Sequence, residues 1–331
     1  MGSRANLKTN PKTSLPPKTL KSARMNAAAL ASTILTFTAI VGVGAALRGL
    51  GILSRQDARP INAIIIYVGL PAFIFKAVHG AQLRPDLWRV VLIAWIVFGV
   101  MLLLGWLVAR ALKLPAETAG GFIIATALGN TGYIGYPITE AFLGKGNLPP
   151  AIFYDVFGTV CALALVGLLI SQHYGTNAEA RVNPLRELFT FPAVVALLIA
   201  LVLRSVAIPN LVSDGLGLLA SMVAPLIMLS VGLSLRASTM LRRAGPLVAL
   251  SSLRLLVAPI IAIGVGWLLF GGADLFVARV LALEAGMPAM MLTLVVGERF
   301  GLDTDFIASA IFVTTAASAV TLPLVQLLAF R

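Results

Sequence analysis

Two long apolar runs of this chain are interrupted by glycine and proline near their middle. The first interruption is GNTGYIGYP, residues 129–137, and the second is EAGMP, residues 284–288. Each run is long enough to cross a bilayer, yet glycine and proline both disfavour a continuous helix. Broken membrane helices occur where the freed backbone groups line a site. The two breaks therefore predict a binding site near the middle of the membrane, as in secondary transporters.

Most of the remaining chain is also apolar. Hydrophobic residues make up 59% of the 331 residues and charged residues 11%, with a mean hydropathy of +0.97. This composition indicates a polytopic membrane protein. Crossing the hydrocarbon core takes about 20 residues, so we predict an all-α fold with ten transmembrane helices. They lie near 29–48, 61–79, 88–110, 118–142, 150–172, 189–208, 215–235, 246–270, 275–298 and 305–328.

The spacing of the prolines suggests an internal repeat. Pro71 and Pro225, in the second and seventh runs, are 154 residues apart, and Pro137 and Pro288, in the fourth and ninth, are 151 apart. Repeats of five helices enter the membrane from opposite sides because five is odd, which predicts an inverted pair with broken, crossing fourth and ninth helices. The predicted units are a tail (1–24), a first repeat (25–172), a short linker (173–188) and a second repeat (189–331).

The tail and the loops carry most of the positive charge. Residues 1–24 are rich in Lys, Thr, Ser and Pro and are expected to be disordered, as a native tail or as an extension upstream of a start at Met25. Short loops after odd-numbered runs contain eleven Lys and Arg residues, and those after even-numbered runs seven. The positive-inside rule then places the linker in the cytoplasm and both termini outside a plasma (inner) membrane. The six positive charges of the tail oppose this orientation.

Several classes of function are disfavoured by composition. The net charge of +12 is spread over tail and loops and forms no groove for nucleic acid. Cys161 is the only cysteine, and His79 and His173 are the only histidines, so neither a metal site nor a catalytic centre is expected. No phosphate-binding loop for ATP is present. We therefore expect no enzyme and no cofactor, apart from a coupling Na⁺ or H⁺.

The first interruption supplies polar groups for a substrate. The amide of Asn130 suits an organic anion or a coupling ion, or it caps the broken helix. Thr131 and Tyr133 offer hydroxyls, although Tyr133 also suits packing. Gly132 and Gly135 are expected to allow close helix crossing, and Pro137 removes a backbone donor. The predicted substrate site comprises Asn130, Thr131, Tyr133, Gly135 and Pro137, with Gly286, Met287 and Pro288 of the second interruption and Met228.

Ionisable residues inside the apolar runs are the other candidates. Glu284 lies deep in the ninth run, where a charge is costly, and is either a coupling group or the partner of Arg254 in the eighth run. Asp155, near one end of the fifth run, is expected at the interface, where a structural role is simpler. Met228, after Pro225, suits an adaptable apolar wall of the site or plain packing.

Five segments together resemble a known family. They are residues 48–75 (RGLGILSRQDARPINAIIIYVGLPAFIF), 129–137 (GNTGYIGYP), 213–235 (SDGLGLLASMVAPLIMLSVGLSL), 251–259 (SSLRLLVAP), and Met287-Pro288 followed by 300–323. In this order they are similar to the auxin efflux carrier family, whose bacterial members include malonate and malate carriers. The resemblance covers essentially the whole chain after Met25. The large central loop of the long plant carriers is absent.

The resemblance implies two inverted five-helix repeats and a homodimer. It implies that helices 1, 2, 6 and 7 form a scaffold, against which helices 3–5 and 8–10 move as a transport unit. Asn130 and the peptide ends beside Pro137 and Pro288 would hold a carboxylate, while Pro71 and Pro225 would shape scaffold helices. Glu284 beside the second break puts a purely potential-driven mechanism in doubt.

The expected function is transport of a small organic anion, such as malate, malonate or an auxin-like acid, by alternating access. A sodium- or proton-coupled symporter or antiporter that uses Glu284 is the main alternative. A channel and an intramembrane enzyme are further possibilities, but the residue sets of the usual enzymes are missing. The expected partners are the anion, the bilayer and a second copy of the chain.

Overall fold

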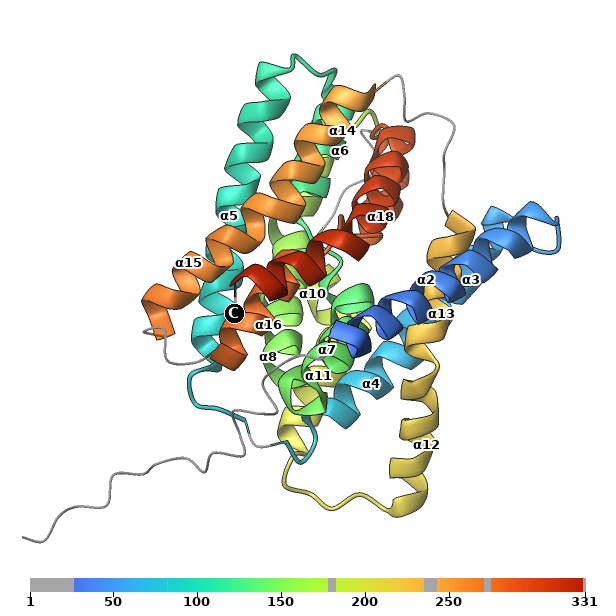
Figure 1. The fold of residues 1–331 in the computed structure, drawn as a ribbon, viewed down its shortest axis with the longest axis vertical. Coiled ribbons are helices and arrows are strands. Elements are labelled where there is room, and N and C mark those ends of the chain that lie inside the picture. Colours follow the sequence, from blue (N-terminus) through green and yellow to red (C-terminus); the bar gives the residue numbers. More distant parts are fainter. Residues whose placement is uncertain (1–26, 82, 178–182, 235–242, 271–274, 330–331) are drawn as a thin grey trace, which may run out of the picture.

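The structure is a computed structural model that describes residues 27–81, 83–177, 183–234, 243–270 and 275–329 (Figure 1). The predicted tail, residues 1–24, and residues 178–182 of the linker lie outside the described residues. Helices occupy all ten predicted runs, with shifts of a few residues at their ends. In the described part of the chain, the β-structure is limited to one isolated bridge.

The first half of the chain contains five helical stretches, several of them composed of shorter α-, 3₁₀- and π-helical pieces. In order these pieces are α2 (Ala27–Gly49), η1 (Arg55–Asp57), α3 (Ala58–Ile64), η2 (Ile65–Gly69), α4 (Leu70–Val78), α5 (Leu87–Ala111), α6 (Ala116–Ala127), η3 (Thr131–Gly135), α7 (Tyr136–Leu143), η4 (Lys145–Asn147), α8 (Leu148–Phe153), η5 (Tyr154–Val160), η6 (Leu163–Gly167) and α9 (Leu168–Tyr174).

The second half is also composed of helical pieces. Its pieces are α10 (Pro184–Thr190), α11 (Pro192–Val202), α12 (Asn210–Ser221), α13 (Val223–Ser234), α14 (Ala244–Ser252), η8 (Leu253–Val257), α15 (Ala258–Phe270), α16 (Leu275–Ala285), α17 (Leu292–Phe300) and α18 (Thr304–Ala329). Helices α10 and α11 meet at a bend of 59°.

A polytopic helical membrane protein is confirmed, but ten complete spans are not. Among the described residues, six helices are long and apolar enough to cross a membrane, or seven if the bent pair α10–α11 counts as one. The fourth and ninth predicted spans are not among these helices, because each is divided into shorter pieces. α6 has 12 residues, α16 has 11 and α17 has 9, and a single uninterrupted helix needs about 20 to cross.

Three π-helical turns each precede a proline by two residues. η2, η3 and η8 each end two residues before Pro71, Pro137 and Pro259, which are near the start of the following α-helical piece. Proline has no N–H, and its ring collides with the carbonyl four residues earlier in a regular helix. A wider turn relieves this collision, so the helix continues through the proline at the cost of local irregularity.

The helices form two groups that lie side by side in Figure 1. In one group α2 and α3 pack on α13, while α4 packs on α11 and α12. In the other group α5 packs on α6 and α15, α15 on α16, and α18 on α6 and α14. The two interrupted stretches, α6–η3–α7 and α16–α17, lie in or beside the second group and reach toward the first.

Helices α2 and α13 approach each other through glycine. A Cβ added to Gly232 would lie 2.8 Å from the amide nitrogen of Ala45 and 2.9 Å from the Cα of Gly44. Small residues at such a crossing let two backbones touch, which favours helix association in a membrane, where lipid offers no hydrophobic driving force. The crossing therefore requires both glycines.

Two polar contacts relate the second stretch to the seventh and the ninth. At one end of the molecule Arg59, at the start of the second stretch, lies 3.2 Å from Glu298, near the end of the ninth. At the opposite end the Nζ of Lys76 donates to the Oγ of Ser213 at 2.8 Å, which joins the end of the second stretch to the start of the seventh. The second stretch is therefore antiparallel to both.

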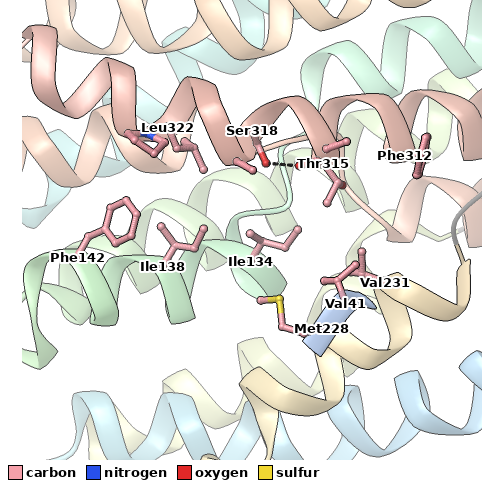
Figure 2. Close-up of a pocket in the computed structure, with 13 residues that line it drawn as sticks. Val41, Ile134, Ile138, Phe142, Met228, Val231, Phe312, Thr315, Ser318 and Leu322 are labelled. Carbon is pink, nitrogen blue, oxygen red and sulfur yellow. Dashed lines mark hydrogen bonds between the residues drawn. The ribbon is translucent and has the colours of Figure 1, made fainter. Parts of the chain in front are cut away.

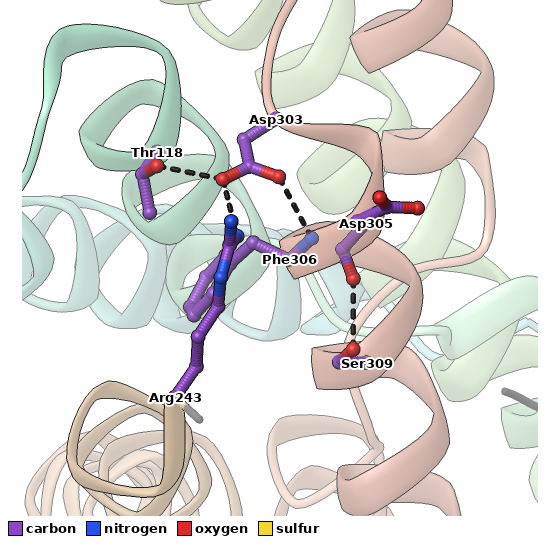
Figure 3. A network of polar contacts seen from close by, with 6 residues as sticks. All are labelled: Thr118, Arg243, Asp303, Asp305, Phe306 and Ser309. Atoms are coloured by element: carbon purple, nitrogen blue, oxygen red, sulfur yellow. Dashed lines mark hydrogen bonds and ion pairs between the residues drawn. The ribbon is translucent and has the colours of Figure 1, made fainter. Parts of the chain in front are cut away.

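Asp303 joins three helix starts at the first of these ends (Figure 3). Its Oδ2 accepts hydrogen bonds from Thr118 of α6, at 2.7 Å, and from Arg243 before α14. Its Oδ1 accepts from the amide of Phe306 at 3.0 Å and so caps α18. Burial alone would raise the pKa of Asp303. The three hydrogen bonds and the charge of Arg243 together lower it by more than burial raises it, so the pKa is below its ordinary value.

We predict that Asp303→Asn lowers the stability of the purified protein at neutral pH by about 1–2 kcal/mol, since Arg243 is partly exposed and screened by solvent. A lowered pKa means that the carboxylate stabilises the fold above the ordinary pKa and loses this effect as the pH falls through the folded-state value. The difference in melting temperature between variant and wild type should therefore shrink in acid.

Asp86→Asn is the matched control, because Asp86 pairs with Arg84 at 2.8 Å on the surface. Such a pair contributes at most about 1 kcal/mol. An equal loss of melting temperature in both variants, or a loss for Asp303→Asn that persists unchanged in acid, would contradict the prediction.

Candidate functional site

The two predicted interruptions are present, and their backbones pair with each other. The chain leaves α6 after Ala127 and resumes helix at Thr131, and it leaves α16 after Ala285 and resumes at Leu292. The amide of Asn130 donates to the carbonyl of Pro288 at 2.8 Å, and the amide of Met290 donates to the carbonyl of Leu128 at 3.0 Å. This short antiparallel bridge satisfies backbone groups that both breaks set free.

Arg254 donates hydrogen bonds to carbonyls at the ends of both interrupted helices. Its side chain comes from η8 and is 2% exposed. Nη1 donates to the carbonyls of Ala127, at 3.1 Å, and Thr126, at 3.3 Å, at the end of α6. Nε donates to the carbonyl of Met287 at 2.9 Å, and Nη2 to that of Ala285 at the end of α16. The positive charge of one guanidinium thus lies at the negative ends of two helix dipoles, where it is stabilising.

The alternative in which Arg254 pairs with Glu284 does not match this geometry. The guanidinium donates to backbone carbonyls, whereas Oε1 of Glu284 accepts from the hydroxyl of Thr139 at 2.9 Å. Glu284 is fully buried, and its Oε2 has no hydrogen-bond partner among the described residues. It is therefore a carboxyl group with half of its hydrogen-bonding capacity unused.

Asp155 is buried beside the first interruption, and the expectation of an exposed side chain is wrong. The residue is 3% exposed, and its stretch starts at Lys145, ten residues before it, instead of near 150. Thr131 and Tyr136 both donate to its carboxylate, the latter at 2.5 Å. Tyr136 also stacks on Phe73 of α4, with 5.6 Å between ring centroids. Asp155 is thus tied to the start of the resumed helix.

Three glycines of the first interruption make room for three buried ionisable residues, Arg254, Asp155 and Glu284. A Cβ on Gly129 would lie 2.8 Å from Nη2 of Arg254, and one on Gly132 would lie 2.8 Å from Oδ2 of Asp155. A Cβ on Gly135 would lie 2.9 Å from Oε1 of Glu284 and closer still to Oε2. The spacing of three residues thus places one small residue against each ionisable group.

Two polar groups of the motif have no partner. Nδ2 of Asn130 and the hydroxyl of Tyr133 are buried and make no hydrogen bond among the described residues. A buried donor without an acceptor costs about 1–3 kcal/mol, so native structures rarely keep one. Asn130 precedes η3 and Tyr133 is its third residue, in the first turn, where the amides of a helix also lack intrahelical acceptors. This place attracts a hydrogen-bond acceptor, preferably an anionic one.

An apolar cavity of about 270 Å³ lies beside the same helix (Figure 2). Ile134 and Ile138 face it from η3 and α7, Met228 from α13, and Phe312 and Leu322 from α18. Thr315 also lines it, and its hydroxyl has no partner among the described residues. Met228 was predicted as a site residue, and it does line this cavity.

The other predicted residues have backbone roles. Pro288 and Met287 accept hydrogen bonds through their carbonyls, and Gly286 donates to the carbonyl of Ala282 at 3.0 Å. Pro137 is buried at the second position of α7. Sequence reasoning missed Tyr136 and Thr139, which hold the two acids, and Thr314, whose Oγ1 accepts from the amide of Ala289 at 3.1 Å. Each of these three residues is a polar side chain within an apolar run, and this feature could have identified them as candidates.

We predict that Gly135→Ala destabilises the protein, because the added methyl group collides with the carboxyl of Glu284. Overpacking of this kind costs about 1–3 kcal/mol. The same change in a Glu284→Ala background should cost much less, and the difference measures the contact in a double-mutant cycle. The measurement is thermal unfolding in detergent.

Gly99→Ala is the matched control, since a Cβ at that position in α5 meets nothing within 4 Å. Its melting temperature should equal or exceed that of the wild type. A Gly135→Ala variant as stable as Gly99→Ala would show that the close approach to Glu284 is absent.

Comparison with known proteins identifies the family of the chain and its relatives. The family described as membrane transport protein matches residues 29–326. An uncharacterized transporter of Methanothermobacter thermautotrophicus is 33% identical over 296 residues, which cover 88% of this chain and 96% of that protein. An uncharacterized transporter of Methanocaldococcus jannaschii is 32% identical over 301 residues, with the same coverage of both chains.

A more distant relative has a name that proposes a cargo. This protein of Rhizobium meliloti, whose name proposes malonate transport, is 23% identical over 275 residues, which cover 79% of this chain and 83% of that protein. These relatives are transporters and not enzymes. The match over most of the chain and the order of the motifs lead to one conclusion. The chain belongs to the membrane transport protein family, that of the auxin efflux carriers.

Proposed function

We propose that this protein is a secondary transporter that moves a small organic anion by alternating access. The observation that carries the proposal is the buried amide of Asn130, whose Nδ2 has no acceptor among the described residues. It stands beside the first amides of η3, and helix starts favour negative charge. A carboxylate of the cargo would satisfy both.

The unpaired donors of the first interruption fit an anionic cargo. Arg254 already donates to the carbonyl ends of α6 and α16, and the unmatched side-chain groups within residues 129–137 are two donors, Nδ2 of Asn130 and the hydroxyl of Tyr133. The carboxylate of Asp155 is directed to Thr131 and Tyr136. Malonate, malate and indole acids share the one feature that this place recognises, a carboxylate. The apolar cavity with Ile134 and Met228 would accommodate the body of the cargo.

The proposed movement uses the two groups of helices. α2, α3, α4 and α11–α13, the helices of the proposed scaffold, pack mainly on one another. We propose that the other group slides against them as an elevator-type transport unit, with the interrupted helices crossing as counterparts in two inverted repeats. A homodimer through the scaffold helices would keep them fixed in the bilayer.

A coupled transporter is the second candidate, and a specific observation favours it. Oε2 of Glu284 is buried without a partner among the described residues. A proton, or a cation close to this oxygen, would complete it. Flux measured in proteoliposomes with and without imposed sodium and pH gradients separates the candidates. Loss of proton dependence in Glu284→Gln would establish coupling at this residue.

We predict that at least one compound of a carboxylate panel, with malonate and malate included, raises the melting temperature of the purified protein. Binding at a hundredfold excess over Kd stabilises by about 2.7 kcal/mol. Asn130→Ala should abolish the shift, because it removes the unpaired donor. The measurement is a thermal-shift titration.

Asn147→Ala is the control, because Nδ2 of Asn147 donates to the carbonyl of Leu143 at 2.6 Å in a loop outside the site. It should retain the full shift caused by the compound. Equal shifts in wild type and Asn130→Ala would remove Asn130 from the binding site.

We also propose that the end of the molecule with Arg59, Arg110 and Arg299 faces the cytoplasm, because short cytoplasmic loops are enriched in Lys and Arg. In a Cys161→Ser background, Lys145→Cys should react with an impermeant maleimide in intact cells. Arg110→Cys should react only after the membrane is opened. The reverse pattern would invert the orientation.

A further inference from the structure

The contacts of Arg254 define a place where a positive charge is required. Its guanidinium donates to four carbonyls, those of Thr126, Ala127, Ala285 and Met287. These carbonyls come from the ends of α6 and α16, two helices more than a hundred residues apart in sequence. Each helix end carries a partial charge of about −0.5. Two such ends meeting in a buried site make a strongly negative position.

Carbonyl oxygens at helix ends are also ligands for alkali cations. In discontinuous membrane helices, unwound carbonyls and half-helix C-terminal ends coordinate Na⁺. The same carbonyl set here is occupied by a side chain with fixed charge and a planar fork of donors. The arginine thus performs the electrostatic task that a bound ion would perform.

The surrounding residues fit the guanidinium closely. A Cβ on Gly129 would lie 2.8 Å from Nη2 and 3.2 Å from Cζ, so a larger residue at that position would displace the group. The nearby acids are directed elsewhere, Asp155 to Thr131 and Tyr136 and Glu284 to Thr139. In the described part of the chain, the positive charge of Arg254 is therefore offset by carbonyl dipoles and not by an ion pair.

We propose that Arg254 is a built-in substitute for a bound monovalent cation at this junction. Removal of its side chain leaves a site that takes up a soluble cation from the medium, with guanidinium the best fit and sodium next. In the intact protein the position is occupied, so transport requires no sodium at this place. The inference does not depend on which anion is carried.

The test is cation-dependent stability of Arg254→Ala, purified and assayed in choline salts at constant ionic strength. The variant should melt below the wild type, since four carbonyls lose their donor. Millimolar guanidinium or methylguanidinium should raise its melting temperature by about 2–4 °C, and sodium by less. The wild type should show no such response to either ion.

Arg89→Ala is the matched control, because Nη1 of Arg89 also donates to a carbonyl at a helix end, that of Leu269 at 3.0 Å, but to one helix only. It should show no rescue. Arg254→Lys keeps the charge and loses the fork, so it should be less stable than the wild type and insensitive to added cations.

Three results would overturn the proposal. The first is an Arg254→Ala variant that melts like the wild type in choline. The second is an equal response to guanidinium in Arg254→Ala and Arg89→Ala. The third is an Arg254→Ala variant that cannot be recovered folded even when it is extracted and purified in guanidinium or sodium salts.

Discussion

The whole arrangement depends on satisfying peptide groups that two broken helices expose inside a membrane. An unpaired carbonyl or amide in that environment costs several kcal/mol, and no water is present to take it. The structure meets this requirement in two ways. Two backbone hydrogen bonds join the interruptions directly, and Arg254 closes the remaining carbonyl ends of α6 and α16. The amide end of η3 has no such partner, nor has Nδ2 of Asn130 among the described residues, and the proposed anion site rests on this asymmetry.

Glycine spacing connects the packing of the site with its electrostatics. Gly129, Gly132 and Gly135 bring Arg254, Asp155 and Glu284 against one short segment of backbone. Charges so close to a helix start interact strongly with its dipole because the surrounding dielectric is low. The resumed helix is therefore held by charged residues from three other stretches, and its position depends on their state.

The sequence predicted the helices and the interruptions, because length, hydropathy, glycine and proline act locally. It indicated that Asn130, Asp155, Arg254 and Glu284 matter, since polar groups within apolar runs need partners. It did not indicate which partners they have. Glu284 is one expected partner of Arg254, but Arg254 instead donates to carbonyls at the end of α6, 127 and 128 positions away, and near the end of α16, 31 and 33 positions away. Asp155 was misplaced because its stretch begins earlier than hydropathy suggested, at a 3₁₀ turn that contains Lys145 and Gly146.

The ring stack between Phe73 and Tyr136 lies between the two groups of helices, since Phe73 belongs to α4 and Tyr136 opens α7. The hydroxyl of Tyr136 donates to Asp155, so one side chain touches both the partner group and the buried acid. If one group slides past the other, Tyr136 cannot keep both contacts. It either follows α7, stays with Asp155 and leaves Phe73, or keeps its stack on Phe73 and releases the carboxylate. Translation between the groups and the hydrogen bonding of Asp155 are therefore mechanically linked through a single phenol.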